Sequence, residues 1–85
     1  MEKFQFSCRN ENGMDVKTAG EFVKEAIKCG GKVTIRNRSK QGDAKLIFNV
    51  MSLNIRKGDE IGIEINGGNE AEDAARLKSF VEKKL

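Results

Sequence analysis

Side chains suited to chemistry are scarce in this sequence. It contains no histidine, the commonest general base and a frequent metal ligand in proteins. Cys8 and Cys29 lie far apart in sequence, and the carboxylates do not cluster at ligand spacing. We therefore expect no catalytic residue, no metal and no cofactor, so the chain is not predicted to be an enzyme. The two cysteines predict buried or half-buried thiols in a reducing cytosol rather than a disulfide framework.

The basic residues are the next candidates for binding. The net charge is +3, from 16 basic and 13 acidic residues. Lys32, Arg36, Arg38 and Lys40 gather around one predicted hairpin, where they could meet an acidic partner or a phosphate. A solvated face is the simpler interpretation of such a run. There is no Trp or Tyr for stacking on bases, so we expect no nucleic-acid binding.

Length and hydropathy limit the possible class of protein. The 85 residues predict one compact domain spanning residues 1–85, with little room for a deep catalytic cleft. No apolar run approaches the roughly 20 residues of a membrane span. The first residues, Met1 to Phe4, lack a signal-peptide core. These features predict a cytoplasmic protein without membrane contact, and we expect a monomer.

The first half of the chain predicts a strand followed by a helix. Residues Phe4 to Cys8 alternate apolar and polar side chains, as in a half-buried strand. A helical spacing of apolar residues then follows, and Asp15 stands where the N-cap is expected. Gly30 and Gly31 are predicted to form its C-terminal cap. The residues of the apolar helical face are Val16, Ala19, Phe22, Val23, Ala26 and Ile27.

The second half predicts two strands, a short apolar element, a fourth strand and a final helix. Val33 to Ile35 begin a strand, and Arg38 to Gly42 form a turn into a short third one. The run Leu46 to Leu53 is too apolar for a loop, but its periodicity fits a short helix or a strand equally well. Ile61, Ile63 and Ile65 alternate in the clearest strand. After the break at Gly67 and Gly68, Asn69 is expected to cap a helix whose apolar face comprises Ala74, Ala75, Leu77 and Val81.

This order of elements predicts an α+β fold. Strand, helix, strand, strand, short helix, strand and helix fit an open-faced sandwich, with an antiparallel sheet and its helices on one face. The pattern by itself does not indicate a function.

Two segments resemble HPr, the histidine-containing phosphocarrier of the bacterial phosphotransferase system. The first runs from Asn10 to Ala19 as NENGMDVKTA, where HPr proteins typically read NxxG(I/L)HARPA. The second runs from Asp43 to Leu53 as DAKLIFNVMSL, with Lys57-Gly58-Asp59 after it, where the family reads NAKSIMGVMSL and then KGD. The resemblance covers essentially the whole chain and implies four strands with three helices packed on one face.

The resemblance also implies that the family's phosphorylation chemistry is absent here. Asp15 occupies the position of the phosphorylated histidine, Lys17 that of the arginine clamp and Thr18 that of a proline. Leu46 occupies the position of the serine that a kinase modifies in some members. A carboxylate at position 15 leaves three interpretations open: an N-cap for the Thr18 N–H, a partial mimic of the phosphorylated state, or an unconventional phosphoacceptor.

The remaining candidate is a protein-docking surface. The resemblance implies that the short helix presents Ile47, Phe48 and Met51 outward, with Leu46 beside them, while Val50 and Leu53 face the core. Val16, Lys17, Gly20 and Lys24 are the expected contacts on the preceding helix. The alternative is that the apolar residues of the short helix are all core. We expect protein partners in the phosphotransferase system or a transcription regulator. A docking paralogue, a carrier using Asp15 and a binding module that kept only the fold are the three functional hypotheses.

Overall fold

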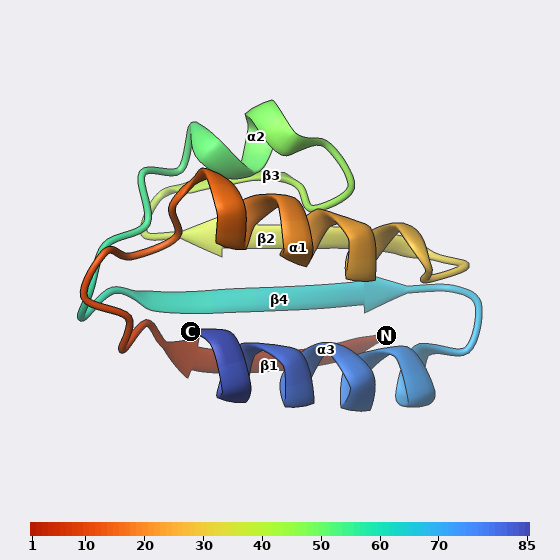
Figure 1. Cartoon of the computed structure of the whole chain (residues 1–85). Coiled ribbons are helices and arrows are strands. Elements are labelled where there is room, and N and C mark those ends of the chain that lie inside the picture. Colours follow the sequence, from red (N-terminus) through yellow and green to blue (C-terminus); the bar gives the residue numbers. More distant parts are fainter.

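The predicted order of elements is confirmed by a computed structural model that describes residues 1–85 (Figure 1). Every expected strand and helix is present, and the ambiguous run after Leu46 forms a short helix. The elements are β1 (Glu2–Ser7), α1 (Val16–Ile27), β2 (Lys32–Asn37), β3 (Lys40–Asp43), α2 (Ile47–Met51), β4 (Glu60–Asn66) and α3 (Glu70–Lys84).

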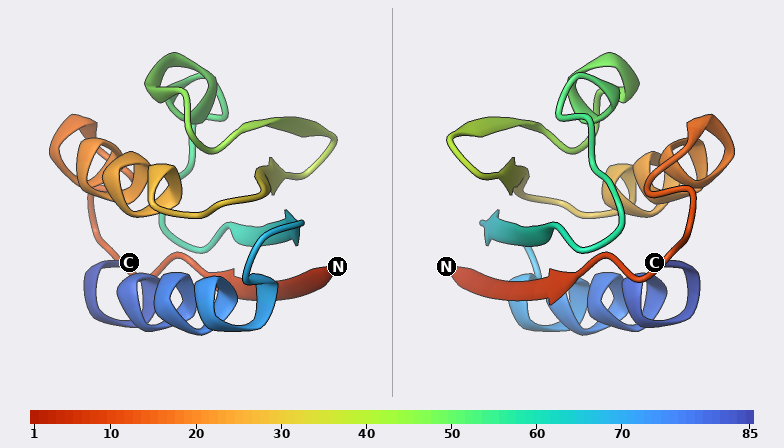
Figure 2. Two further views of the ribbon diagram at one scale, coloured as in Figure 1. Left: turned by 90° about the vertical axis from the view of Figure 1, so that its right-hand side faces the viewer. Right: turned by 90° about the vertical axis from the view of Figure 1, so that its left-hand side faces the viewer.

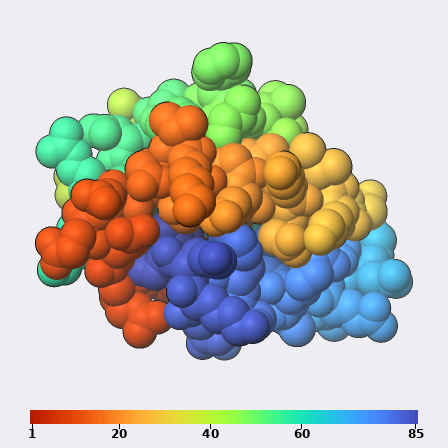
Figure 3. Space-filling model, viewed as in Figure 1, coloured from red at the N-terminus to blue at the C-terminus, as the bar shows by residue number.

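The four strands form one antiparallel sheet in the order β1-β4-β2-β3. Ile63 of β4 lies opposite Phe4 of β1 on one side and Ile35 of β2 on the other. The three helices cover one face and leave the other open, which confirms the predicted open-faced sandwich (Figure 2). Figure 3 shows α1 and α3 side by side across the helical layer, with α2 above them.

The core lies between the sheet and the helices. Alternate residues of β2 and β4 point inward, so Val33, Ile35 and the three isoleucines of β4 are buried. Phe22 of α1 and Leu77 of α3 pack onto them from above. Burying such side chains contributes about 1.5–3 kcal/mol each to the free energy of unfolding. None of the helices has the length and apolar character needed to cross a membrane.

Three residues assigned to apolar helical faces are exposed instead. Val16 and Ile27 lie at the two ends of α1, and Ala75 lies on the solvent side of α3. Helical periodicity identifies the direction of a stripe but not its width, so residues at the margin are placed correctly only once the neighbouring elements are known. Asp73 replaces Ala75 among the buried residues of α3 because Arg76 binds its carboxylate at 3.0 Å.

The helix caps predicted at Gly30, Gly31 and Asn69 do not form in the way expected. Lys28 is the C-cap of α1, and neither Gly30 nor Gly31 adopts positive φ. Gly31 is required because a Cβ there would lie 2.2 Å from the carbonyl oxygen of Asn66. Asn69 occupies the N-cap of α3, but its side chain makes no capping bond. The N–H of Gly67 donates instead to Glu70 Oε2 at 2.6 Å.

The β2–β3 turn is tighter than predicted, and β1 is slightly displaced. β3 already begins at Lys40, so the turn consists of Arg38 and Ser39, with Arg38 at φ 61°. Cys8 lies just beyond the end of β1. Both cysteines are free and buried, as predicted. Burial raises the pKa of both thiols, which keeps them in the unreactive protonated form.

Candidate functional site: the α1 N-terminus and the α2 surface

Asp15 is held by the first turn of α1. Its backbone is extended, with φ −76° and ψ 178°, and its Oδ1 accepts a hydrogen bond from the Thr18 N–H at 2.9 Å. The predicted N-cap is therefore confirmed. The Thr18 backbone N–H, with its side-chain hydroxyl as a second donor, lowers the pKa of the Asp15 carboxyl. This residue remains an exposed carboxylate at neutral pH.

Lys17 and Lys24 also lie on the exposed side of α1. Both side chains are exposed, and neither forms an ion pair within the chain. Their ammonium groups are therefore free to meet carboxylates on another molecule. Lys17 follows the Asp15 cap by two residues, and its proximity makes a minor contribution to the lowered Asp15 pKa.

The short helix α2 presents an apolar surface to solvent. Phe48 is 84% exposed and Leu46 is 53% exposed, whereas Ile47 and Met51 are half-buried against the core. The hypothesis that all of these residues belong to the core is therefore wrong for Phe48 and Leu46. Val50 and Leu53 are buried, as expected.

A stripe of α1 continues this apolar surface. α1 lies between α2 and α3 (Figure 1). Glu25 on one flank of α1 binds Arg76 of α3, with Nε and Oε1 at 3.3 Å. Because an α-helix has 3.6 residues per turn, Val16, Gly20 and Ile27 lie on the flank of α1 opposite Glu25. This flank therefore faces α2. We call Val16, Gly20, Ile27, Leu46, Ile47, Phe48 and Met51 the apolar patch.

Ile27 and Gly20 extend the apolar patch along α1. Ile27 is 58% exposed, although its spacing had placed it on the buried face. Ile27 lies eleven residues after Val16 and therefore on the same side of the helix, which is the sequence signal that could have placed it beside Val16. Gly20 leaves open space, because no atom lies within 4 Å of where its Cβ would be. The partner-binding roles of these residues remain predictions.

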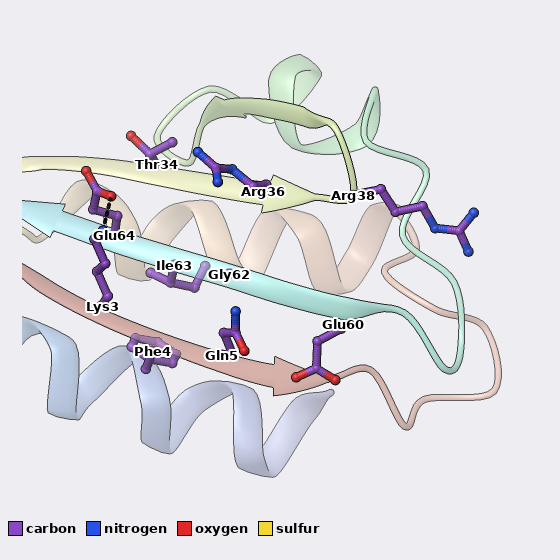
Figure 4. A pocket seen from close by; sticks show the side chains of 10 residues that line it. All are labelled: Lys3, Phe4, Gln5, Thr34, Arg36, Arg38, Glu60, Gly62, Ile63 and Glu64. Carbon is purple, nitrogen blue, oxygen red and sulfur yellow. Dashed lines mark ion pairs between the residues drawn. The ribbon is translucent and has the colours of Figure 1, made fainter.

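The open face of the sheet carries a shallow hollow of about 400 Å³, seen in Figure 4. Gly62 lies in its floor, directly opposite Gln5 and Arg36 on the flanking strands. Lys3 pairs with Glu64 at 3.7 Å across one side. Arg36 donates to Gln41 at 2.8 Å. Lys3, Glu64 and Arg36 are thus already engaged within the chain, so the hollow does not present a reactive constellation.

The fold and these surfaces define a class of protein: a small open-faced sandwich with an exposed patch beside a capped helix start and no enclosed cleft. The sequence model of the HPr family, described as "PTS HPr component phosphorylation site", matches residues 2–83 of this chain. The chain therefore belongs to the HPr family of the bacterial phosphotransferase system.

Individual relatives support this assignment. Phosphocarrier protein HPr of Mycoplasma capricolum is 38% identical over 74 residues, covering 87% of this chain and 82% of the relative. The structure of HPr-C-His from Thermoanaerobacter tengcongensis superposes with a TM-score of 0.93 at 26% identity, covering 99% of this chain and 94% of that one. The catabolite-repression protein Crh of Bacillus subtilis, solved as a domain-swapped dimer, gives 0.76 at 27% identity, covering 100% and 98%.

Proposed function

We propose that this chain is a regulatory or docking member of the HPr family that acts by protein–protein contact and is neither a catalyst nor a phosphocarrier. The observation that carries the proposal is the state of position 15. The residue there is a carboxylate engaged as the N-cap of α1, and the chain contains no histidine. The exposed apolar patch lies beside it and supplies a surface for binding.

The chemistry at position 15 supports the loss of phosphoryl transfer. An imidazole nitrogen can attack a phosphoryl group and hold it at a helix N-terminus. The Asp15 carboxylate is a much weaker nucleophile and already binds the Thr18 N–H at 2.9 Å. Lys17 provides one point charge where an arginine would provide a two-pronged donor. Leu46 has no hydroxyl for a kinase to modify.

The apolar patch supports a role in docking. An aromatic side chain that is 84% exposed at Phe48 has no structural reason to face water in a domain this small. Lys17 and Lys24 flank the patch and would complement acidic residues at the rim of a partner. We propose that this partner is a protein of the phosphotransferase system or a transcription regulator.

Calorimetric titration with enzyme I, the family's phosphoryl donor, tests the docking role. We expect the wild-type chain to bind and to compete with authentic HPr. Phe48→Ala is expected to weaken binding by about 1–3 kcal/mol, as for a central apolar anchor. Lys78→Ala, an exposed site on α3, is the matched control and should leave the affinity unchanged. Equal affinities of wild type and Phe48→Ala would remove the patch from the interface.

A restored variant tests whether the lost chemistry is confined to position 15 and its neighbours. Asp15→His, Lys17→Arg and Thr18→Pro together replace the acceptor, the clamp and the N–H that Asp15 satisfies. Proline is tolerated in the first turn of a helix, so the triple variant should fold. We expect it to accept a phosphoryl group from enzyme I. A folded triple variant that stays unmodified would show that docking on enzyme I has also been lost.

A further inference from the structure

A second hollow of about 300 Å³ lies where the β2–β3 turn meets the loop between α2 and β4. Arg38 and Lys40 come from the hairpin whose basic character is visible in the sequence. Asn37, the last residue of β2, lies beside them. The fold adds Arg56 and Asp59 from the loop between α2 and β4. Figure 4 shows Arg38 extending past the end of β2, where it also lines the hollow on the open sheet face.

The lining of this hollow is strongly positive. It combines three cationic side chains with the single carboxylate of Asp59. Both oxygens of that carboxylate are already engaged. Oδ1 binds Arg38 at 3.1 Å, and Oδ2 accepts from the Arg56 N–H at 3.0 Å and from Asn37 Nδ2 at 3.1 Å. The side chains of Lys40 and Arg56 have no ion-pair partner in the chain, so their charges are available to a ligand.

Asn37 forms part of the lining and carries an unpaired acceptor. It is only 5% exposed, and its Nδ2 donates to the Leu53 carbonyl at 3.0 Å as well as to Asp59. Reversing the amide would set its oxygen against these two acceptors, so its orientation is fixed. Its Oδ1 is buried and accepts no hydrogen bond. A buried acceptor of this kind normally has a donor, and no group of the chain supplies one.

We propose that this hollow binds a small phosphate monoester. Arg and Lys side chains bind phosphoryl oxygens through short charge-assisted hydrogen bonds, and the dianion matches the net charge of +2 on the lining. The volume of about 300 Å³ suits a ligand of a few carbon atoms. Neither Asp15 nor the apolar patch takes part, so this site is independent of the proposed docking role.

Titration of the labelled chain with glycerol 3-phosphate, followed by amide chemical shifts, tests the site. We expect saturable binding with shifts confined to residues 37–40 and 53–59. Arg56→Gln should weaken it at least fivefold. Lys32→Gln removes the same charge at the other end of β2 and should change the affinity less than twofold. Absence of saturable binding, or equal losses in the two variants, would overturn the proposal.

The contribution of the ester's carbon chain is tested on the ligand side. Inorganic phosphate keeps the phosphoryl oxygens of glycerol 3-phosphate but has no carbon atoms to fill the hollow. We expect it to bind the wild-type chain several-fold more weakly. Equal affinities of inorganic phosphate and glycerol 3-phosphate would reduce the site to a simple anion site and overturn the proposal of an ester ligand.

Discussion

At the scale of single residues, Asp15 and Thr18 are explained together. A proline at position 18 would have no N–H, whereas Thr18 introduces a donor at the third position of α1 that needs an acceptor. Asp15 provides that acceptor at the spacing typical of an N-cap. A local rule of three residues is enough to predict this contact, which is why it could be found in the sequence.

The Asp15 cap should make stability depend on pH in the acid range. The folded-state pKa of Asp15 is lowered by its bonds to Thr18, so the stabilisation is present above the unfolded-state pKa and is lost as the pH falls through the folded-state pKa. Asp15→Asn keeps a neutral acceptor. We expect its melting temperature to lie below that of the wild type at pH 7, with the difference shrinking as the pH falls below about 4 and disappearing only below the lowered folded-state pKa of Asp15. Thermal melts across this range measure it, and a constant difference would contradict the assignment.

Phe48 should contribute little to the fold, in contrast to its neighbour two residues on. Phe48→Ala removes a ring that is 84% exposed, so we expect the free energy of unfolding to change by less than about 0.5 kcal/mol. Val50→Ala, in the same helix, removes a buried side chain and should cost about 1.5–3 kcal/mol. Urea denaturation measures both. A loss on Phe48→Ala as large as on Val50→Ala would place Phe48 in the core.

At the scale of elements, β1, β2 and β4 were predictable from the alternation of apolar residues and α1 from its periodicity, whereas β3 was expected only because a turn precedes it. α2 was not, because five residues are too few to distinguish a helical period from a strand. Its identity depends on packing, through Val50 and the half-buried Ile47 and Met51. The exposure of Val16 and Ile27 at the ends of α1 also depends on the neighbouring helices. The ion pair of Glu25 with Arg76 turns one flank of α1 toward α3 and leaves the other beside α2.

The glycines Gly20 and Gly31 should respond in opposite directions to substitution by alanine. Gly20→Ala places a methyl group in open space within α1 and should raise the free energy of unfolding by up to about 1 kcal/mol. Gly31→Ala forces a Cβ against the Asn66 carbonyl and should lower it by about 1–3 kcal/mol. Chemical denaturation of the two variants measures the contrast. A stabilised Gly31→Ala would mean that the α1–β2 and β4–α3 connections lie further apart.

At the scale of the whole molecule, an antiparallel sheet with its helices on one face follows from the pattern of elements, but the surfaces do not. The hollow at the β2–β3 turn needs Arg56 beside Arg38, two residues that no periodic pattern connects. The apolar patch likewise joins α1 to a helix twenty residues further along the chain. Contacts of this kind exist only in the folded chain, so the sequence predicts candidate residues for a patch but not its extent.

The intact mass of the wild-type chain after incubation with phosphoenolpyruvate and enzyme I tests the central claim most directly. Authentic HPr in the same mixture is the positive control, and the sample is kept at neutral pH to preserve acid-labile phosphate. We predict no mass increase, because the chain has no imidazole and Asp15 serves as a helix cap. Stoichiometric gain of one phosphoryl group would contradict it and identify the chain as a phosphocarrier with an unconventional acceptor.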